Sequence, residues 1–303
     1  MMSQADADKS LLLQPGTLWK HTVARTQHGL ACGALQPMET VCEFIEQAGV
    51  HFLVRSLVNR GRQHFDNKAK RTADVGFNPF LPYDEDLFVT DISATHLCLL
   101  NKFNVLDHHL LVVTRDFEEQ EKALTWRDFH ALSACMAEIN GLAFYNSGPA
   151  AGASQQHKHL QFAPLPLAPT GPPIPMEPAL HLDSVGAEVS SSPDLPFVHS
   201  LVRLDPDLFT APATAADALF EYYNDMLQAV NVQIRADKPS SPYNLLVTQQ
   251  WMLLVPRTRG AFDSIAINSL GFAGLLLAKN AQSMQKIKAH GPITVLRNVS
   301  VSS

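Results

Sequence analysis

The stretch GASQQHKHLQF, residues 152–162, decides the fold. It places His157, His159 and Gln161 at alternate positions behind a turn of small residues. Side chains along a strand point alternately to opposite faces, so these three are expected on one face and the residues between them on the other, in a core. Three polar side chains on one face need partners, so the strand predicts a buried polar network, a metal site or a ligand site.

The residues around this stretch predict strands and helices in turn. THLCLLNKFNVLDHHLLVVTRD, residues 95–116, has two apolar runs around a polar centre, which indicates a hairpin with a buried second strand over 110–114. Thr125 with Asp128 three residues later is typical of a helix start, and Gly141 of a helix end. A strand over residues 142–145 then leads into the small-residue turn.

The C-terminal part repeats the order of hairpin and helix. Leu219, Tyr222, Met226 and Val230 lie at helical spacing, and residues 243–260 form two apolar runs joined at Gln249 and Gln250, a tight hairpin. A last helix is expected from about Asn268 through NSLGFAGLLLAKNAQSMQKIK. Before residue 85 the apolar stretch over 51–58 and the turn-rich segment FNPFLPYDED, residues 77–86, are the main signals.

Composition narrows the class of protein. The 303 residues are 46% hydrophobic, without eighteen apolar residues in succession, and the first thirty do not have the pattern expected of a signal peptide. The four cysteines are far apart without a CxxC pair. These features predict a cytoplasmic protein with reduced thiols. A formal charge of −6 disfavours nucleic-acid and membrane partners, because phosphate-rich surfaces require a basic face. The basic residues available for a local phosphate site are Lys102, Lys158, Arg257, Arg259 and Lys279.

Three interpretations of the two histidines are open. They could be a hydrogen-bonded surface pair, or two ligands of a zinc ion that would recruit a third ligand such as His108 or His109 through the fold. They could also supply a nucleophile toward phosphorus, since imidazole is available in its neutral form near pH 7. The turn formed by Gly148, Gly152, Ala153 and Ser154 supports the third interpretation, because such turns bind anions.

Four ordered blocks resemble the ATP adenylyltransferases, or diadenosine tetraphosphate phosphorylases, the branch of the histidine-triad superfamily with HxHxQ. The blocks are LLNKFNVLDHHLLVVT (99–114), YNSGPAAGASQQHKHLQ (145–161), YNLLVTQQWMLLVPR (243–257) and NSLGFAGLLLAK (268–279). The resemblance implies an α+β fold: a histidine-triad-like antiparallel sheet flanked by helices, completed by a C-terminal hairpin-plus-helix extension. It also implies a catalytic region over residues 1–165, a proline-rich crossover over 166–200 and an adenylyltransferase region over 201–303.

The resemblance also assigns roles to residues. It makes His159 the nucleophile that accepts the adenylyl group, with His157 orienting the active-site network and Gln161 binding a phosphate oxygen. It implies no protein-bound metal. The substrate-binding residues that it implies are Asn101, Lys102, Asn146, Gly152, Ala153, Ser154, Gln155, Asn268, Ser269, Leu270, Leu275 and Lys279, with Arg60 as the N-terminal basic residue at the phosphate site.

Gln161 distinguishes transfer to phosphate from transfer to water. An amide neither gives nor takes a proton near neutral pH, so it suits a polyphosphate leaving group and an ionised acceptor. The reaction expected is diadenosine tetraphosphate plus phosphate to ATP and ADP, reversibly, through an adenylyl-histidine, with ADP formation from adenylyl sulfate as a further reaction. The alternatives are a dinucleoside polyphosphate hydrolase and a hexose-1-phosphate uridylyltransferase. We expect a monomer without a tightly bound cofactor, whose Mg²⁺ or other divalent cation arrives with the nucleotide.

Overall fold

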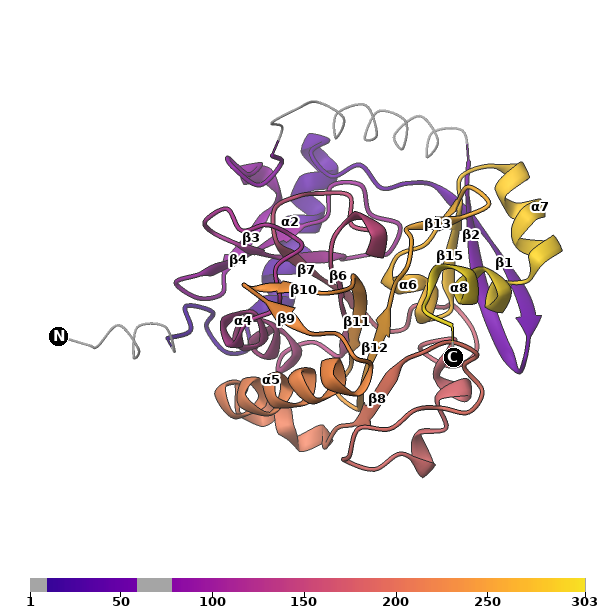
Figure 1. The fold of residues 1–303 in the computed structure, drawn as a ribbon. Helices are drawn as coiled ribbons and strands as arrows, with labels where there is room; N and C mark the ends of the chain where they lie inside the picture. Colours follow the sequence, from indigo (N-terminus) through magenta and orange to yellow (C-terminus); the bar gives the residue numbers. More distant parts are fainter. Residues whose placement is uncertain (1–9, 59–77, 303) are drawn as a thin grey trace.

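The computed structural model describes residues 10–58 and 78–302, and its centre is an eight-stranded sheet (Figure 1). Every neighbouring pair of strands in this sheet is antiparallel. In spatial order the strands are β3 Phe88–Asp91, β4 His96–Leu100, β5 Leu110–Thr114, β7 His159–Pro164, β6 Gly141–Asn146, β11 Tyr243–Val247, β12 Trp251–Pro256 and β8 Ser200–Arg203. The predicted α+β class, an antiparallel sheet flanked by helices, is confirmed.

The predicted elements around the histidine stretch are present. Strands β4 and β5 form the expected hairpin, and β5 is buried along its whole length. Helix α4 (Trp126–Met136) begins with a capping box between Thr125 and Asp128, but it ends at Met136, five residues before Gly141. That glycine instead begins strand β6.

The C-terminal elements continue the same sheet. Helix α5 (Pro212–Ala229) is followed by β11 and β12, which a two-residue turn joins at Gln249 and Gln250. Strand β11 then pairs with β6, where Asn244 lies opposite Asn146. The two halves of the chain therefore share one sheet.

Helices and loops cover the two faces of the sheet differently. Helices α4 and α5 lie side by side over one face, and the start of α2 (Leu18–Cys32) joins their apolar cluster (Figure 1). On the other face, one apolar cluster lies under the β6–β12 part and a smaller one lies under β4 and β5. No helix among the described residues is both long and apolar enough to cross a membrane.

The predicted last helix is wrong in its middle. The segment forms α6 (Ser269–Phe272), then strand β15 (Leu275–Ala278), and then α7 (Ala281–His290). Gly274 interrupts the helix with a φ of +87°, and β15 pairs in parallel with β2 (Val50–Leu57), which also pairs with β1 (Thr40–Gln47). The leucine run is a buried strand because β2, far away in the sequence, offers it an edge.

The proline-rich segment between β7 and β8 is an ordered loop rather than a flexible linker. Leu167, Ile174, Met176 and Leu180 are buried in the cluster under the β6–β12 part of the sheet. The N–H of Met176 donates to the carbonyl of Ala273 at 3.1 Å, which attaches the loop to the C-terminal part. The division of the chain into three regions at residues 165 and 200 stays a prediction.

Short elements complete the chain. They are the 3₁₀ turns η1 Glu85–Leu87, η2 Pro149–Ala151, η3 Glu177–Leu180, η4 Leu182–Ser184 and η5 Pro206–Thr210, the short strands β9 Ile234–Arg235, β10 Lys238–Pro239, β13 Ala261–Phe262 and β14 Ile265–Ala266, and the last helix α8 Pro292–Val299.

Candidate active site

His159 begins β7 and His157 lies two residues before it, on the face of the sheet opposite α4 and α5. His159 is opposite Val113 of β5, and Gln161 is flanked by Leu111 of β5 and Phe144 of β6. These neighbours belong to the two apolar clusters of that face, so the polar side chains lie at the seam between the clusters. The predicted alternation is therefore confirmed.

His157 precedes the strand and is buried within a polar network. Its Nε2–H is directed at the carbonyl oxygens of Thr114 at 2.9 Å and Asp116 at 3.1 Å, and its Nδ1 accepts from the Asn78 amide at 3.0 Å. Burial lowers the pKa of His157 and outweighs these carbonyl contacts, which act in the opposite direction. A neutral ring with this tautomer is suited to holding its surroundings in place rather than to moving a proton.

His159 receives its orientation from the backbone of its neighbour. Its Nδ1 lies 2.8 Å from the carbonyl oxygen of His157, and a carbonyl oxygen can only accept, so Nδ1 carries the proton. The nucleophilic lone pair of the neutral ring is therefore on Nε2. Phe80 lies against both rings, at 5.6 Å from His157 and 5.3 Å from His159 between ring centroids, which limits their tilt.

A cavity of about 500 Å³ opens beside His159, and we call it the histidine cavity. Apolar residues form most of its wall, and Lys102, whose Nζ donates to Asp84 at 3.0 Å, lies at its edge. Its lining residues include Asn78, Phe80, Asp84, Leu87, Asn101, Lys102, Phe103, Ser154, Gln155, His159 and Gln161. An apolar wall with a few polar groups is typical of a site for a ring-bearing ligand.

A second cavity of about 250 Å³ adjoins the first, and we call it the leucine cavity. It is lined by residues from the C-terminal block together with the β4–β5 hairpin. Among its lining residues are Asn101, Phe103, His109, Gly152, Ser154, Gln161, Asn268, Leu270, Leu275, Leu276 and Lys279. Asn101, Phe103, Ser154 and Gln161 line both cavities, so the two cavities meet at Gln161, two residues beyond His159 on β7, and at Asn101 and Ser154 beside it.

The small-residue turn is built by two glycines with positive φ. Gly148 has φ +92° and Gly152 has φ +93°. The N–H groups of Gly152 and Ala153 donate back to the carbonyls of Pro149 and Gly148, both at 3.0 Å, so they hold the turn itself. These two N–H groups are therefore engaged within the turn, while Gly152 lines the leucine cavity and Ser154 and Gln155 line the histidine cavity.

Behind the strand, Lys158 is buried in an ionic network. Its ammonium group donates to Asp128 at 2.8 Å and to Glu118 at 3.2 Å, and Asp128 also contacts Nε2 of His96 at 3.1 Å. Burial opposes ionisation of Asp128, but the hydrogen bonds and charges of His96 and Lys158 outweigh it and lower its pKa. Lys158, the residue between the two histidines, is thus fixed behind the strand and does not face the cavities.

Arg257, a second basic residue considered for phosphate, is also structural. Its guanidinium donates to the carbonyls of Ala151, Val299, Arg259 and Ile267 and to the side-chain oxygen of Asn244. Five donors and five acceptors leave no direction for a ligand. Burial lowers the pKa of Arg257 to about 9.

Some predicted substrate residues lie beneath the cavities rather than in their walls. The side-chain oxygen of Asn146 accepts from Asn244 at 2.9 Å and from the N–H and hydroxyl of Ser269, both at 2.8 Å. These residues connect the two halves of the site. Arg60 lies outside the described residues.

Three residues near the site escaped the sequence interpretation. Gln120 accepts from the N–H of His159 at 2.8 Å and donates to its carbonyl at 3.2 Å, and nothing in its local sequence marks it. Phe80 lies in the segment noted for its turns. His109, considered above only as a possible zinc ligand, is buried and lines the leucine cavity, and its alternation with Leu111 of β5 was the available signal.

Comparison with known proteins agrees with this architecture. The family model described as the Ap4A phosphorylase N-terminal domain matches residues 8–182, and the one described as the ATP adenylyltransferase C-terminal domain matches residues 193–302. In curated proteins, Diadenosine 5',5'''-P1,P4-tetraphosphate phosphorylase 2 of Saccharomyces cerevisiae is 30% identical over 238 residues, 69% of this chain and 71% of that protein. Protein APA1 of the same yeast is 30% identical over 216 residues, 62% of this chain and 63% of that protein.

Solved structures show the same fold. The crystal structure of yeast Ap4A phosphorylase Apa2 has a TM-score of 0.78 at 22% identity and covers 96% of this chain and 99% of its own. The same protein in complex with Ap4A has a TM-score of 0.73. Two family models that together span nearly the whole chain, on a fold that holds HxHxQ at the seam of two cavities, make this chain a member of the Ap4A phosphorylase (ATP adenylyltransferase) family of enzymes.

Proposed function

We propose that the chain catalyses the reversible phosphorolysis of diadenosine tetraphosphate to ATP and ADP, with His159 as the nucleophile. The observation that carries this proposal is the meeting of two cavities at Ser154 and Gln161, beside His159. A dinucleoside polyphosphate has a ring system at each end and a polar chain between them. Two largely apolar cavities joined at polar side chains match that order.

In the first step Nε2 of His159 attacks the α-phosphorus, and the bond from that phosphorus to the bridging oxygen breaks, so that ATP leaves. The ring becomes positively charged when its nitrogen forms the P–N bond. Its Nδ1–H points at the His157 carbonyl, 2.8 Å away, and this dipole stabilises the charge that develops. In the second step inorganic phosphate attacks the same phosphorus, the P–N bond breaks, and ADP is released.

Gln161 suits both steps because neither requires a proton from the enzyme. The polyphosphate leaves as an anion, and inorganic phosphate arrives already ionised. The amide donates a hydrogen bond to a phosphate oxygen as charge develops, which is electrostatic stabilisation without proton transfer. Adenylyl sulfate, another mixed anhydride of AMP, is expected to deliver the same adenylyl group and so to give ADP with phosphate.

The remaining components follow from the lining of the cavities. Asp84 is the acidic residue among the described lining residues, and it already pairs with Lys102. We therefore propose that Mg²⁺ enters on the polyphosphate rather than in a cage of protein carboxylates. We further propose that the enzyme acts as a cytoplasmic monomer, which size-exclusion chromatography and localisation of a tagged chain would check.

The test uses diadenosine tetraphosphate labelled at the α-phosphorus, without inorganic phosphate. We expect one AMP adduct per chain, located on the peptide that carries His159 by mass spectrometry, and its loss as ADP when phosphate is added. His159→Ala is expected to abolish both the adduct and turnover, whereas His51→Ala on the exposed side of β2 keeps both. Full turnover by His159→Ala, or an adduct elsewhere, contradicts the mechanism.

A hydrolase of the same superfamily is the alternative. The same assay separates the two, because a hydrolase releases AMP at the same rate with or without inorganic phosphate. Release of ADP that rises with phosphate supports the phosphorylase.

A further inference from the structure

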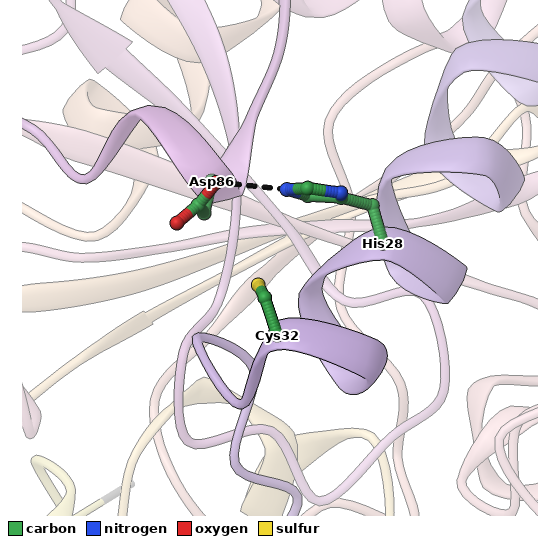
Figure 2. A group of neighbouring side chains, drawn as sticks. All are labelled: His28, Cys32 and Asp86. Atoms are coloured by element: carbon green, nitrogen blue, oxygen red, sulfur yellow. Dashed lines mark hydrogen bonds and ion pairs between the residues drawn. The ribbon is translucent and has the colours of Figure 1, made fainter.

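A group of metal-ligating side chains lies outside the catalytic site, between helix α2 and turn η1. His28 and Cys32 lie on α2, and Asp86 lies on η1 (Figure 2). Their donor atoms, one imidazole nitrogen, the thiol sulfur and one carboxylate oxygen, lie within 4.8 Å of one another. We propose that these three residues bind a zinc-class divalent ion.

The backbone presents the three donors independently of any ion. Residues four apart on a helix share a face, so His28 and Cys32 both point toward η1, as Figure 2 shows. Gly29 lies between them, and a Cβ there would lie 3.6 Å from the buried side chain of Leu87, an ordinary contact distance. The glycine thus faces η1, which packs directly against this part of the helix.

Both elements are held in place. The N–H of Leu18 at the start of α2 donates to Glu138 at 2.7 Å, and the N–H of Asp86 donates to the side chain of Asp84 at 3.2 Å. Arg25 of α2 donates to the carbonyl of Glu85 at 3.3 Å and joins the two elements directly. A metal ion would therefore find its ligands on a largely formed frame and require side-chain movement alone.

The donor set selects the class of metal. A thiolate with an imidazole is preferred by zinc and its neighbours, whereas Mg²⁺ and Ca²⁺ prefer oxygen ligands. In a tetrahedral zinc site the ligand atoms are roughly 3 to 4 Å apart, so closing the cluster requires shifts of about 1 Å. Nε2 of His28 already lies 2.7 Å from Asp86, and all three side chains are exposed and able to adjust.

Metal binding is expected to release one proton from the site. The thiol of Cys32 loses its proton to solvent, and the hydrogen bond between His28 and Asp86 is replaced by two bonds to the ion. One M²⁺ with a thiolate and a carboxylate gives a neutral group. Water completes the fourth position of a three-residue site.

The site has a structural connection to the histidine cavity. Asp84 and Leu87, on either side of Asp86, line that cavity, and Asp84 pairs there with Lys102. An ion that ties Asp86 to α2 is therefore expected to restrain the wall formed by residues 78–87. This inference does not depend on the reaction proposed above.

The binding test uses Co²⁺ with the metal-free full chain and no nucleotide. We expect one Co²⁺ per chain with a thiolate-to-cobalt charge-transfer band that Zn²⁺ removes and excess Mg²⁺ does not. Cys32→Ser is expected to abolish the band, and His28→Ala and Asp86→Ala are each expected to weaken binding at least tenfold. Cys42→Ser is the matched control, since Cys42 is also an exposed free thiol but lies outside the group.

The results of the Co²⁺ test support or overturn the proposed metal site without any measurement of catalytic activity. No charge-transfer band, a band that survives Cys32→Ser, or a band lost in Cys42→Ser overturns it and leaves His28 and Asp86 as a surface ion pair only. Hydrogen exchange supplies the second readout. Zn²⁺ should slow exchange in residues 78–87 of the native chain and not in His28→Ala, and equal exchange with and without Zn²⁺ overturns the connection to the cavity wall.

Discussion

At the scale of single residues, the two histidines are held in different ways, which suits His159 to the proposed role of nucleophile and His157 to that of scaffold. His159 takes its tautomer from a carbonyl two residues away on the same chain, so local sequence suffices for it. His157 takes its tautomer from Thr114 and Asn78, which are brought to it by the fold. The tautomers of the two rings therefore have different origins, because one contact is local in the sequence and the others are not.

The proposed role of Gln161, favouring phosphate over water as the acceptor of the adenylyl group, can be tested by substitution. Gln161→His is expected to raise the ratio of hydrolysis to phosphorolysis, because an imidazole at this position can take a proton from water. The measurement is AMP against ADP formed from diadenosine tetraphosphate at fixed phosphate. Gln161→Asn, which keeps the amide but shortens it, should lower both rates without changing their ratio, and an unchanged ratio in Gln161→His would argue against the role given to the amide.

At the scale of elements, helix α4 supports the histidine strand through a single carboxylate. Asp128 completes the capping box with Thr125 and also receives Lys158 from β7, so the start of the helix and the strand share one residue. The cap was readable in the sequence, because its spacing is local. The partner Lys158 was not, since it is thirty residues away and its burial depends on the packing of α4 against the sheet.

Asp128→Asn is expected to lower the free energy of unfolding by about 3 to 5 kcal/mol at pH 7, since it leaves Lys158 as a buried cation with one partner fewer. The lowered pKa of Asp128 fixes the sign of the pH dependence. Its stabilisation is present above the unfolded value near 3.8 and is lost as pH falls through the lower folded value. Urea unfolding at pH 7 and at decreasing pH should show the difference between the two proteins shrinking in acid.

Two further variants control this experiment. Asp217→Asn removes an exposed carboxylate that accepts from Trp126, and it should change stability by less than about 0.5 kcal/mol. The double variant Asp128→Leu with Lys158→Met removes both buried charges and should recover part of the loss. A loss below about 1 kcal/mol in Asp128→Asn would contradict the importance of this pair.

Gly152 connects the small-residue turn with the C-terminal block. An added Cβ would lie 2.4 Å from the carbonyl oxygen of Ile267 and 2.7 Å from Cα of Asn268, both backbone atoms. Gly152→Ala is therefore expected to move the turn or the Asn268 segment and to weaken nucleotide binding at least tenfold in calorimetry. Both of the joined cavities include Ser154, so the displacement reaches the centre of the site.

Gly171→Ala is the matched control for this variant. Gly171 has a similar φ of +83°, but nothing lies within 4 Å of its added Cβ. It reproduces the backbone strain of an alanine at positive φ without the collision. Equal loss of binding in both variants would assign the effect to strain alone and contradict the connection between the turn and Asn268.

At the scale of the whole molecule, the continuous sheet predicts one cooperative unfolding unit. Strands β6 and β11 pair across the halves, and Arg257 ties β12 to the Ala151 turn and to α8. We expect tryptophan fluorescence and far-UV circular dichroism to give one shared urea midpoint. The experiment uses two variants, one that keeps only Trp126 in the first half and one that keeps only Trp251 in the second.

Within each variant the fluorescence midpoint should equal the circular dichroism midpoint. Separate midpoints for the reporter and the backbone signal would mean that the halves unfold independently. Such a result would contradict the view that the shared sheet holds both parts of the site in register.

Much of the fold and of the catalytic set could be predicted because the responsible signals are local. The alternation over residues 157–161, the β4–β5 and β11–β12 hairpins, and the start of α4 all depend on neighbours within a few residues. The resemblance that assigns roles to His159, His157 and Gln161 depends on the same local stretch, and these roles stay predictions. Helix α2 and strand β1 were missed because their local patterns are weak and β1 is largely exposed.

The sequence by itself determined the histidine strand and the chemistry that an amide in the third position allows, since both depend on residue type and a period of two. Only the tertiary structure decided the rest. It turned the Leu275–Ala278 run into a strand beside β2, gave Lys158 and Arg257 structural roles, and brought Gln120 to His159. These outcomes depend on burial and on partners distant in the chain, which no local pattern encodes.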